Sequence, residues 1–545
     1  MKRNLRRLGW CLGSLVVLGL VGWGILLRCV PTPPPLPADL SITQLAPVSR
    51  DGKVFLGKNW YGKRDGLNVL HITGTPFEMG YANGVLTQDL IHRQENTLLE
   101  LIQTVAPRKW IQAVLKVMVI FQNRHLPNYV APDIQMEILG LTKGCPDIHP
   151  EVGPYFARIL SYHGAQDISY MMMNSPLIRG GCTAFAVWGP ATVDGHLLTG
   201  RNFDWEAAPV FDEDRVLILC EPDRGIPFVS LAWAGMAGCV SGLNREGISI
   251  TVNGAPSHLP GSARTPTCLV AREVLQKART LAEATDIIRQ SQVFVSALFL
   301  VGSRHDGRFI VVEKTCDQTA VREETKLPFI INANHYLTPL LKDDPINLKY
   351  RSADTSVSRD CCARELLTNA TAKLDAPLAA ALLRDRRLPG GVFAGNGHRG
   401  SLNPLIATHA VIMDLTAGIF WAATPPHQLG RFVACDVNRM DRELPERTIA
   451  ADPLLTSGEY DRYVASKKLL EQGRQALRAK DYSRAVECAR NAEHLNPGFY
   501  QNAWLLGEAL LKQGDKSAAR EALTAALKGQ PAFAAEKRKI EELMR

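Results

Sequence analysis

Hydrophobic and polar positions divide the chain into four parts. A run without charged residues lies near the N-terminus, within residues 1–40. Residues 41–181 mix short β-prone stretches with apolar residues at helical spacing. Residues 182–450 contain many short β-prone stretches and two helical blocks, and residues 458–545 have helical spacing throughout. Because strands repeat every second residue and helices every 3.6, this pattern predicts an α+β protein with a separate helical C-terminal domain.

The N-terminal apolar run, Leu8 to Leu27, is 20 residues long. A helix of that length spans a bilayer at about 1.5 Å per residue. Basic residues precede it, which predicts a cytoplasmic N-terminus, an extracytoplasmic body and a single-pass membrane protein. The alternative is a cleaved signal peptide and a secreted protein, but no small-x-small cleavage site follows. Arg28 before Cys29 fits a lipidation site poorly. The proline-rich residues 31–37 then form a stiff spacer.

Two patterns stand out in residues 41–181. Leu67 to Thr73 is typical of a strand, and the following Thr75-Pro76 with Glu78 predicts the start of a capped helix. Gly80 and Gly84 in that helix predict close packing. Leu98 to Phe121 is apolar at helical spacing, and we expect it to be an ordinary core helix.

The part after residue 181 contains the β-rich stretches and helices of the predicted core. The strands are expected at Val216–Leu219, Phe228–Trp233, Ile248–Val252, Ala297–Val301 and Phe309–Glu313, and the helices at Thr267–Lys277 and Leu281–Gln290. By itself, this periodicity predicts only the α+β class.

Cys182 follows a glycine pair, Gly180-Gly181, and begins an apolar β-prone stretch. Asp194-Gly195 separates that stretch from a second one, which predicts a hairpin. A two-residue turn would place residues i and 389−i opposite each other. Asp204 would then pair near Phe185, three residues or about 10 Å from Cys182. The pattern therefore brings the cysteine and an aspartate to one end of a hairpin.

A cysteine in this setting can be a catalytic nucleophile. If the Gly181–Cys182 bond is cut, the new α-amino group lies beside the thiol and titrates at about 7.7–8.0, which suits a general base. The glycine pair gives the backbone the freedom that self-cleavage requires. The alternative is a buried structural cysteine in a hairpin.

The motifs around Cys182 resemble the start of a mature N-terminal-nucleophile (Ntn) hydrolase. Gly181-Cys182-Thr183, the Asp194-Gly195 turn and Gly200 to Asp204 are similar to the penicillin acyltransferase-like (isopenicillin N acyltransferase) family, which is related to choloylglycine hydrolases. The run Gly74 to Gly84 also resembles that family's pre-nucleophile region. The resemblance implies a four-layer αββα sandwich, self-cleavage between Gly181 and Cys182, and hydrolysis or transfer of amide-linked acyl groups. Residues 41–181 would become the small subunit.

The same resemblance implies roles for later residues. Arg201, Asp204 and Arg359, the last in a Ser-x-x-Arg motif with Ser356, would position the nucleophile; Arg351 competes with Arg359 for this role. Asn334, in Asn334-His335-Tyr336, and Asn253 would stabilise the oxyanion. In a regular hairpin Arg201 shares a face with Cys182 and Asp204 lies on the other. A bulge or strand end near Asn202 would bring both to the nucleophile.

The C-terminal part repeats with a period of 34 residues. The shift superposes Gly473 on Gly507, Leu477 on Leu511, Asp481 on Asp515, Ala485 on Ala519 and Pro497 on Pro531. This period resembles tetratricopeptide repeats. Two repeats are fewer than usual, so we expect Phe533 to Met544 to cap the stack or the pair to dock on the enzyme. A peptide-binding groove and a packing or dimerisation appendage remain alternative interpretations.

Charge and cysteine usage narrow the function. Four of the formal +8 charges come from Lys2, Arg3, Arg6 and Arg7, and no basic-aromatic stripe exists, so a nucleic-acid partner is not expected. The 12 cysteines lack zinc spacing, and His335, His398 and His409 form no ligand pattern, so we expect no metal or cofactor. We predict a membrane-anchored hydrolase or acyltransferase acting on a small N-acyl amide. The alternative is an uncleaved scaffold that binds protein partners through its repeats.

Overall fold

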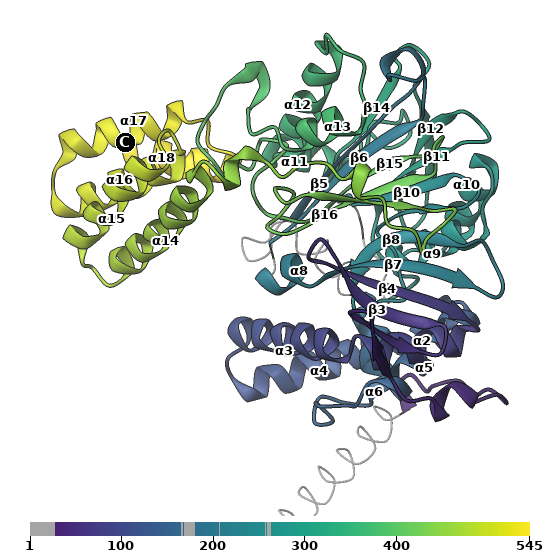
Figure 1. The fold of residues 1–545 in the computed structure, drawn as a ribbon. Helices are drawn as coiled ribbons and strands as arrows, with labels where there is room; N and C mark the ends of the chain where they lie inside the picture. The colour runs from purple at the N-terminus through teal and green to yellow at the C-terminus, as the bar shows by residue number, and fades with distance from the viewer. Residues whose placement is uncertain (1–27, 165–166, 168–179, 207, 257, 259–262) are drawn as a thin grey trace, which may run out of the picture.

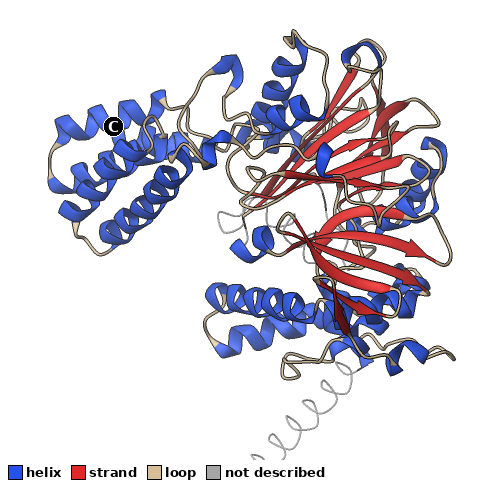
Figure 2. Ribbon diagram, in the orientation of Figure 1, coloured by secondary structure: helices blue, strands red, loops and turns tan. Residues whose placement is uncertain are grey.

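The structure, a computed structural model, describes residues 28–545 except 165–166, 168–179, 207, 257 and 259–262. Two β-sheets stack face to face, and helices cover the outer face of each (Figure 1, Figure 2). Three large apolar clusters fill the space between the sheets and the space under each helical layer. The predicted α+β class with a helical C-terminal region is confirmed, and the described layers follow the order α-β-β-α.

The larger sheet has eleven strands in the described part of the chain, all antiparallel except for the parallel pair β4–β7. In spatial order they are β1 (Val48–Arg50), β2 (Lys53–Leu56), β3 (Asn59–Arg64), β4 (Leu67–Gly74), β7 (Arg215–Pro222), β8 (Phe228–Trp233), β9 (Ser241–Asn244), β10 (Ile248–Gly254), β11 (Ala297–Ser303), β12 (Arg308–Lys314) and β13 (Thr319–Glu323). The smaller, antiparallel sheet is ordered β14 (Phe329–Asn332), β5 (Gly180–Val187), β6 (Leu198–Trp205), β15 (Ala407–Asp414), β16 (Ile419–Ala423) and β17 (Phe432–Asp436).

The strands predicted from the sequence lie in the central, fully covered part of the larger sheet. β7, β8, β10, β11 and β12 contain the five predicted stretches, and β4 contains Leu67 to Thr73. Every residue of β8, β10 and β11 is buried. Since both faces are covered, these strands are continuous apolar runs and not alternating ones.

Helices α2 (Pro76–Leu86) and α5 (Pro132–Gly144) cross at their glycines on the outer face of the larger sheet. Thr75 and Glu78 form the predicted capping box of α2. A Cβ atom at Gly80 would lie 1.8 Å from the carbonyl oxygen of Glu137, and one at Gly140 would lie 2.1 Å from that of Phe77. The two backbones approach this closely only because side chains are missing at the crossing. The predicted close packing is therefore confirmed.

The prediction for Leu98 to Phe121 is wrong in two respects. The stretch is not one helix, because α3 (Gln88–Val105) ends before Pro107 and α4 (Lys109–Asn123) begins after it. It is not ordinary core either, since α4 buries only Asn123 and leaves Trp110 63% exposed. Helical spacing identified the apolar residues but gave no information about what covers them.

The remaining helices of the core flank the two sheets. α6 (Tyr155–Tyr162), α9 (Thr267–Lys277) and α10 (Leu281–Gln290) contribute to the cluster outside the larger sheet, and α9 and α10 match the predicted helices. α12 (Ser356–Thr368) and α13 (Ala376–Leu383) contribute to the cluster outside the smaller sheet. Two further helices, α8 (Pro209–Glu213) and α11 (Pro345–Ala353), lie in connecting segments.

The C-terminal helices form a separate lobe at one side of the core (Figure 1). They are α14 (Glu459–Arg478), α15 (Tyr482–Leu495), α16 (Tyr500–Gln513), α17 (Lys516–Lys528) and α18 (Ala534–Met544). The repeated glycines lie inside the helix pairs, where a Cβ at Gly473 or Gly507 would lie 2.6 Å from a leucine side chain. Asn396 and Asn496 exchange buried hydrogen bonds, so the module docks on the core. The likeness to tetratricopeptide repeats and the binding of a partner stay predictions.

The predicted membrane segment Leu8 to Leu27 lies outside the described residues. Within residues 28–545, apart from the gaps noted above, no helix combines the length and the apolar character that crossing a bilayer would require.

Candidate active site

Cys182 lies near the start of β5, which pairs with β6 on one side and β14 on the other. Its partner in β6 is Phe203, and Asp204 faces Gly181. Facing residues thus sum to 385 and not to the predicted 389. The connection is longer than a two-residue turn, because residues 189–191 form a 3-10 helix and Val193 N–H donates to the Leu374 carbonyl at 3.0 Å. The correction brings Asp204 closer to the nucleophile than the two-residue turn implied.

Arg201 and Asp204 lie on opposite faces of β6, as the regular hairpin predicted. Cys182 faces Phe203 and Ala184 faces Arg201, which places all four on the face toward the larger sheet. The β5–β6 ladder is unbroken. The irregularity lies on the other side of β6, in β15 between Ala407 and His409. The bulge near Asn202 that would bring both residues to one face is therefore not present in β6.

Arg201 is fully buried and its Nη2 lies 3.4 Å from the Cys182 Sγ. Backbone carbonyls of Val240 and Val252 accept from its guanidinium and fix its position. Burial raises the pKa of the Cys182 thiol, and the nearby Arg201 charge opposes that rise. In the intact chain the thiol is thus held protonated beside a cation that would stabilise a thiolate.

Two side chains that were not selected from the sequence also hold Arg201 in place. Ser241 Oγ accepts from Nη1 at 2.7 Å, and His409 Nε2 lies 3.2 Å from the same atom. Burial holds the pKa of His409 well below its usual range, so the neutral imidazole can accept from the guanidinium. Neither residue lies in a motif, and only the packing of β9 and β15 around β6 reveals them.

Asn334 contacts the backbone nitrogen of Cys182. Its Oδ1 accepts from Cys182 N–H at 2.8 Å and from Arg359 Nη2 at 2.8 Å. Its Nδ2 donates to the Gly254 carbonyl, and its own N–H donates to Ser356 Oγ, both at 2.8 Å. The acceptor oxygen of the amide therefore faces the nitrogen that cleavage would turn into an α-amine.

Arg359, at the N-terminal turn of α12, spans the nucleophile and Asn334. Its Nη1 donates to the Cys182 carbonyl at 2.5 Å and to Thr183 Oγ1 at 2.7 Å. Both ends of the Ser-x-x-Arg motif contact Asn334. Ser356 Oγ accepts a hydrogen bond from the backbone N–H of Asn334, and Arg359 donates one to the side-chain amide oxygen of Asn334. Of the two competing arginines, Arg359 is thus the one whose hydrogen bonds reach Cys182.

Asn253 lies in β10 of the larger sheet, whereas Cys182 lies in the smaller sheet. Its Nδ2 donates to the carbonyls of Asn332 and Ala333 at 2.7 and 2.9 Å. Both amide hydrogens are thereby used, and among the described residues its Oδ1 has no hydrogen-bond partner. In this structure Asn253 holds the segment that carries Asn334, and its oxyanion role stays a prediction.

Asp204 is buried on the face opposite to Cys182, and neither carboxylate oxygen has a hydrogen-bond partner within the part of the chain that is described. Burial raises its pKa to about 6, although Arg359, Arg399 and Arg201 counteract the shift. The folded chain therefore binds a proton here between about pH 4 and 6, where the unfolded chain does not.

We expect Asp204→Asn to stabilise the uncleaved chain at neutral pH. A raised carboxyl pKa means that ionisation destabilises the fold above about pH 6, and that this cost disappears as the pH falls to about 4. The gain in free energy of unfolding should reach about 3 kcal/mol at pH 8 and vanish near pH 4. Denaturant unfolding in a Cys182→Ala background measures it, with Asp194→Asn on an exposed loop as control. An equal effect at both pH values would contradict this account.

The Arg359 guanidinium lies against Gly181, where a side chain would push it aside. A Cβ atom there would lie 2.9 Å from Arg359 Nη2. Gly181→Ala is therefore expected to displace the guanidinium from the Cys182 carbonyl and to slow cleavage strongly. Among the described residues, a Cβ at Gly180 would meet the Asp204 carbonyl at 3.3 Å and no other atom, so Gly180→Ala should slow cleavage less. The fraction of cut chain over time, followed on a denaturing gel, measures both. Equal rates for the two variants would contradict the proposed contact.

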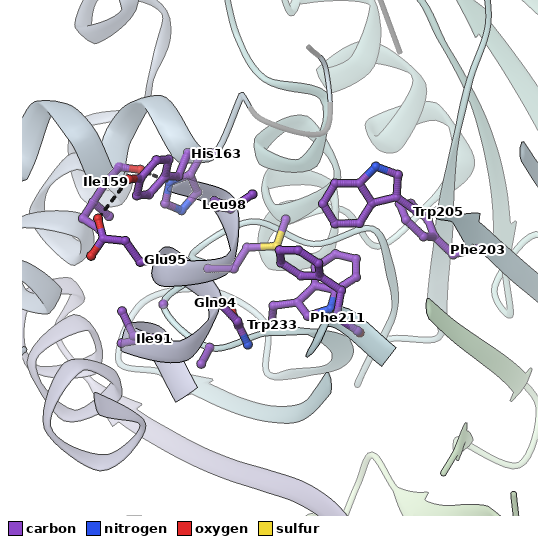
Figure 3. A pocket seen from close by; sticks show the side chains of 14 residues that line it. Ile91, Gln94, Glu95, Leu98, Ile159, His163, Phe203, Trp205, Phe211 and Trp233 are labelled. Atoms are coloured by element: carbon purple, nitrogen blue, oxygen red, sulfur yellow. Dashed lines mark hydrogen bonds between the residues drawn. The ribbon is translucent and has the colours of Figure 1, made fainter. Parts of the chain in front are cut away.

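An aromatic cavity of about 110 Å³ lies next to the nucleophile's strand pair. Figure 3 shows Phe203, Trp205, Phe211 and Trp233 on one side of it and residues of α3 and α6 on the other. Phe203 is both a wall of this cavity and the partner of Cys182 in the ladder. An apolar group bound in the cavity would thus contact the residue of β6 that pairs with Cys182.

No group of three or more His, Cys, Asp and Glu residues within the described ranges could hold a metal ion. Arg201 and Arg359 contact Cys182, and the Asp204 carboxyl group lies behind it on the opposite face of the hairpin. This arrangement suits nucleophilic attack on a carbonyl and the stabilisation of negative charge.

Comparison with known proteins agrees with this chemistry. Residues 191–389 match the family model of acyl-coenzyme A:6-aminopenicillanic acid acyl-transferase. The match begins after Cys182, so the position of the nucleophile depends on the motif and the geometry. The core of the chain is thus similar to an acyltransferase family that acts on amide bonds.

Two curated relatives are similar over part of their length. An uncharacterised protein of Archaeoglobus fulgidus is 27% identical over 311 residues, covering 50% of this chain and 51% of the relative. Protein dcd1B of Dictyostelium discoideum is 23% identical over 335 residues, covering 57% and 62%. The chain therefore spans about half to three-fifths of the length of these relatives.

Three solved structures have low similarity to part of the chain. A Caenorhabditis elegans N-acylethanolamine-hydrolyzing acid amidase ortholog has a TM-score of 0.33 at 14% identity, covering 43% of this chain and 93% of that one. Conjugated bile acid hydrolase from Clostridium perfringens, as its R18L variant, has a TM-score of 0.34 at 14% identity, covering 48% and 95%. Penicillin V acylase from Agrobacterium tumefaciens has a TM-score of 0.32 at 14% identity, covering 48% and 87%.

Proposed function

We propose that the protein is a cysteine Ntn hydrolase or acyltransferase, matured by self-cleavage between Gly181 and Cys182, that acts on a small N-acyl amide. The observation that carries the proposal is the pair of contacts at Cys182. Asn334 Oδ1 accepts from its backbone nitrogen, and Arg201 lies 3.4 Å from its sulfur. When the α-amine of the nucleophilic residue is its own base, both the backbone nitrogen and the sulfur of that residue must be held in position.

In the proposed reaction the free α-amine of Cys182 takes the thiol proton, and the thiolate attacks the amide carbon. The carbonyl oxygen becomes an oxyanion, and the amine then returns the proton to the leaving nitrogen. An acyl-thioester on Cys182 and a free amine result. Water or a second amine attacks the thioester and regenerates the thiol, so hydrolysis and transfer share one intermediate.

We propose that the first role of Asn334 is to orient the α-amine of Cys182. Its oxygen accepts from the Cys182 nitrogen, and the same contact would direct the lone pair of an α-amine toward Sγ. The second hydrogen of Nδ2 remains for an oxyanion, because the only described acceptor of Nδ2 is Gly254. Arg201 and Arg359 supply positive charge on either side.

The experiment that tests this function is a screen of purified wild-type protein against N-acyl amides and β-lactams, each with and without an added amine acceptor. Release of the amine identifies hydrolysis, and a new amide identifies transfer. The aromatic cavity favours an apolar acyl group. An active wild type and an inactive Cys182→Ala variant are expected. Turnover that is equal in both would exclude the proposed site.

The second candidate function is an uncleaved scaffold that binds proteins through the C-terminal helices. The docking of that module on the core by the Asn396–Asn496 pair supports a packing role for the helices instead, which counts against this candidate. The two candidates are separated by a denaturing gel, since only the enzyme requires two fragments.

We further propose that residues 8–27 attach the enzyme to a membrane, with the catalytic body extracytoplasmic. The support is the uncharged 20-residue run and its basic flank. The full-length chain is expected to require detergent for extraction, and a chain beginning at Ala38 is not. Recovery of the uncut full-length chain in the soluble fraction would contradict the proposal.

A further inference from the structure

Helix α4 is apolar but almost uncovered. Trp110, Val114, Val117, Met118 and Phe121 follow helical spacing on one side of it, and we name this surface the α4 face. Their exposed fractions range from 46% at Val117 to 63% at Trp110. A helix that buries only Asn123 gains little from packing on the core, so its apolar residues require another explanation.

The charged residues next to the α4 face along the chain are all basic. Residues 106–132 contain no aspartate or glutamate. Arg108 and Lys109 begin the helix and Arg124 follows its end, whereas Lys116 lies on the other side and donates to the Glu151 carbonyl. An apolar strip with tryptophan and phenylalanine beside basic residues matches the surface of an anionic bilayer, where rings lie at headgroup level and basic side chains reach the phosphates.

Helix α4 lies where the described chain begins, and the side of it opposite to the α4 face points toward that start. Val30 and Pro31 line a cavity of about 710 Å³ together with residues of α3, α4 and α6. The apolar segment 8–27 ends immediately before Arg28. Figure 1 shows α3 and α4 together at the end of the molecule farthest from the helices α12 and α13. A membrane that holds segment 8–27 would therefore adjoin this end.

We propose that the α4 face inserts into the headgroup region of an anionic bilayer as a second membrane contact. The proposal rests on the membrane attachment suggested for residues 8–27 and not on the catalytic function. Association of two copies through this face fits the observations less well, because a two-fold axis would bring the basic residues at the ends of α4 in each copy together. One membrane span leaves a body free to rotate, whereas a second contact fixes its orientation toward the bilayer.

The test replaces Phe121 in the full-length chain by photoreactive benzoylphenylalanine. Phe393 supplies a matched control, because it is 52% exposed and Phe121 is 54% exposed. Each protein is reconstituted in vesicles of phosphatidylcholine and phosphatidylglycerol in equal parts, irradiated and digested, and its adducts are identified by mass spectrometry. We expect lipid adducts at position 121 and few or none at position 393.

Four results would overturn the proposal. They are cross-links from position 121 to residues 8–27 of the same chain, cross-links to a second copy, equal lipid yields at both positions, and no lipid adduct at all. None of these readouts requires catalysis, so they are distinct from failure of the proposed enzyme function.

A second measurement tests the lipid charge. Neutralising Arg108 and Lys109 together, as Arg108→Gln with Lys109→Gln, should lower the adduct yield at position 121 by about fivefold or more in the mixed vesicles, as expected for basic residues at an anionic surface. The yield in pure phosphatidylcholine should change little. An unchanged yield in the mixed vesicles would contradict the role of anionic lipid.

Discussion

Replacing Cys182 by alanine is expected to leave one uncut chain without amidase or acyltransferase activity, whereas the wild type separates into two fragments. Both steps require the same sulfur, first against the carbonyl of Gly181 and then against the substrate. The loss should therefore be complete in both. Intact mass and turnover of a screened N-acyl amide measure it.

A second buried cysteine provides the control for this variant. Cys435 in β17 is fully buried in the same sheet as Cys182. Cys435→Ala should lose some stability through the cavity it leaves but should still mature and turn over substrate. If Cys182→Ala is cut between residues 181 and 182, or retains activity, Cys182 is not the nucleophile.

Replacing Asn334 by alanine is expected to lower kcat by about a hundred- to a thousandfold with little change in KM. The amide acts where charge develops on the substrate oxygen and where the α-amine must be aligned, and both matter mainly in the transition state. Self-cleavage should slow as well, because Asn334 contacts the Cys182 nitrogen in the uncut chain. Steady-state kinetics on matured, folded protein provide the measurement.

Asn332 is the matched control, since it is also buried and lies two residues away, at the end of β14. Its Nδ2 donates to the Leu298 carbonyl at 3.3 Å, which is not at the nucleophile. Asn332→Ala should lose stability but keep kcat within a few-fold of wild type. The account of Asn334 fails if its variant keeps wild-type kcat, or if both variants lose kcat equally. A pH profile of kcat would separate its two roles, because loss of amine alignment moves the limb set by the α-amine and loss of an oxyanion donor does not.

The sequence predicted secondary structure well where local pattern determines it. Buried strands such as β8 and β10 are continuous apolar runs, and the Thr75–Glu78 capping box is a local hydrogen-bond motif. The residues that meet at the nucleophile were also selected from the sequence, because Cys182, Arg201, Asn334 and Arg359 lie in recognisable motifs. Their assigned roles stay predictions until the variants are measured.

Features that depend on distant contacts could not be predicted. The predicted β5–β6 register was wrong because the connection is longer than two residues; it contains a 3-10 helix at residues 189–191 and is bonded to the Leu374 carbonyl. Ser241 and His409 support Arg201 from strands far away in the sequence. Helix α4 is exposed because little of the described chain packs against it. The spacing of apolar residues predicts a helix but does not show whether another element covers it.

The central claim is that Cys182 works with its own free α-amine, and N-terminal sequencing of the active wild-type protein tests it most directly. The account predicts that the fragment containing the active site begins with Cys182, and that the fraction of cut chain rises in parallel with specific activity. Fully active protein in which the bond between Gly181 and Cys182 is intact would contradict the account.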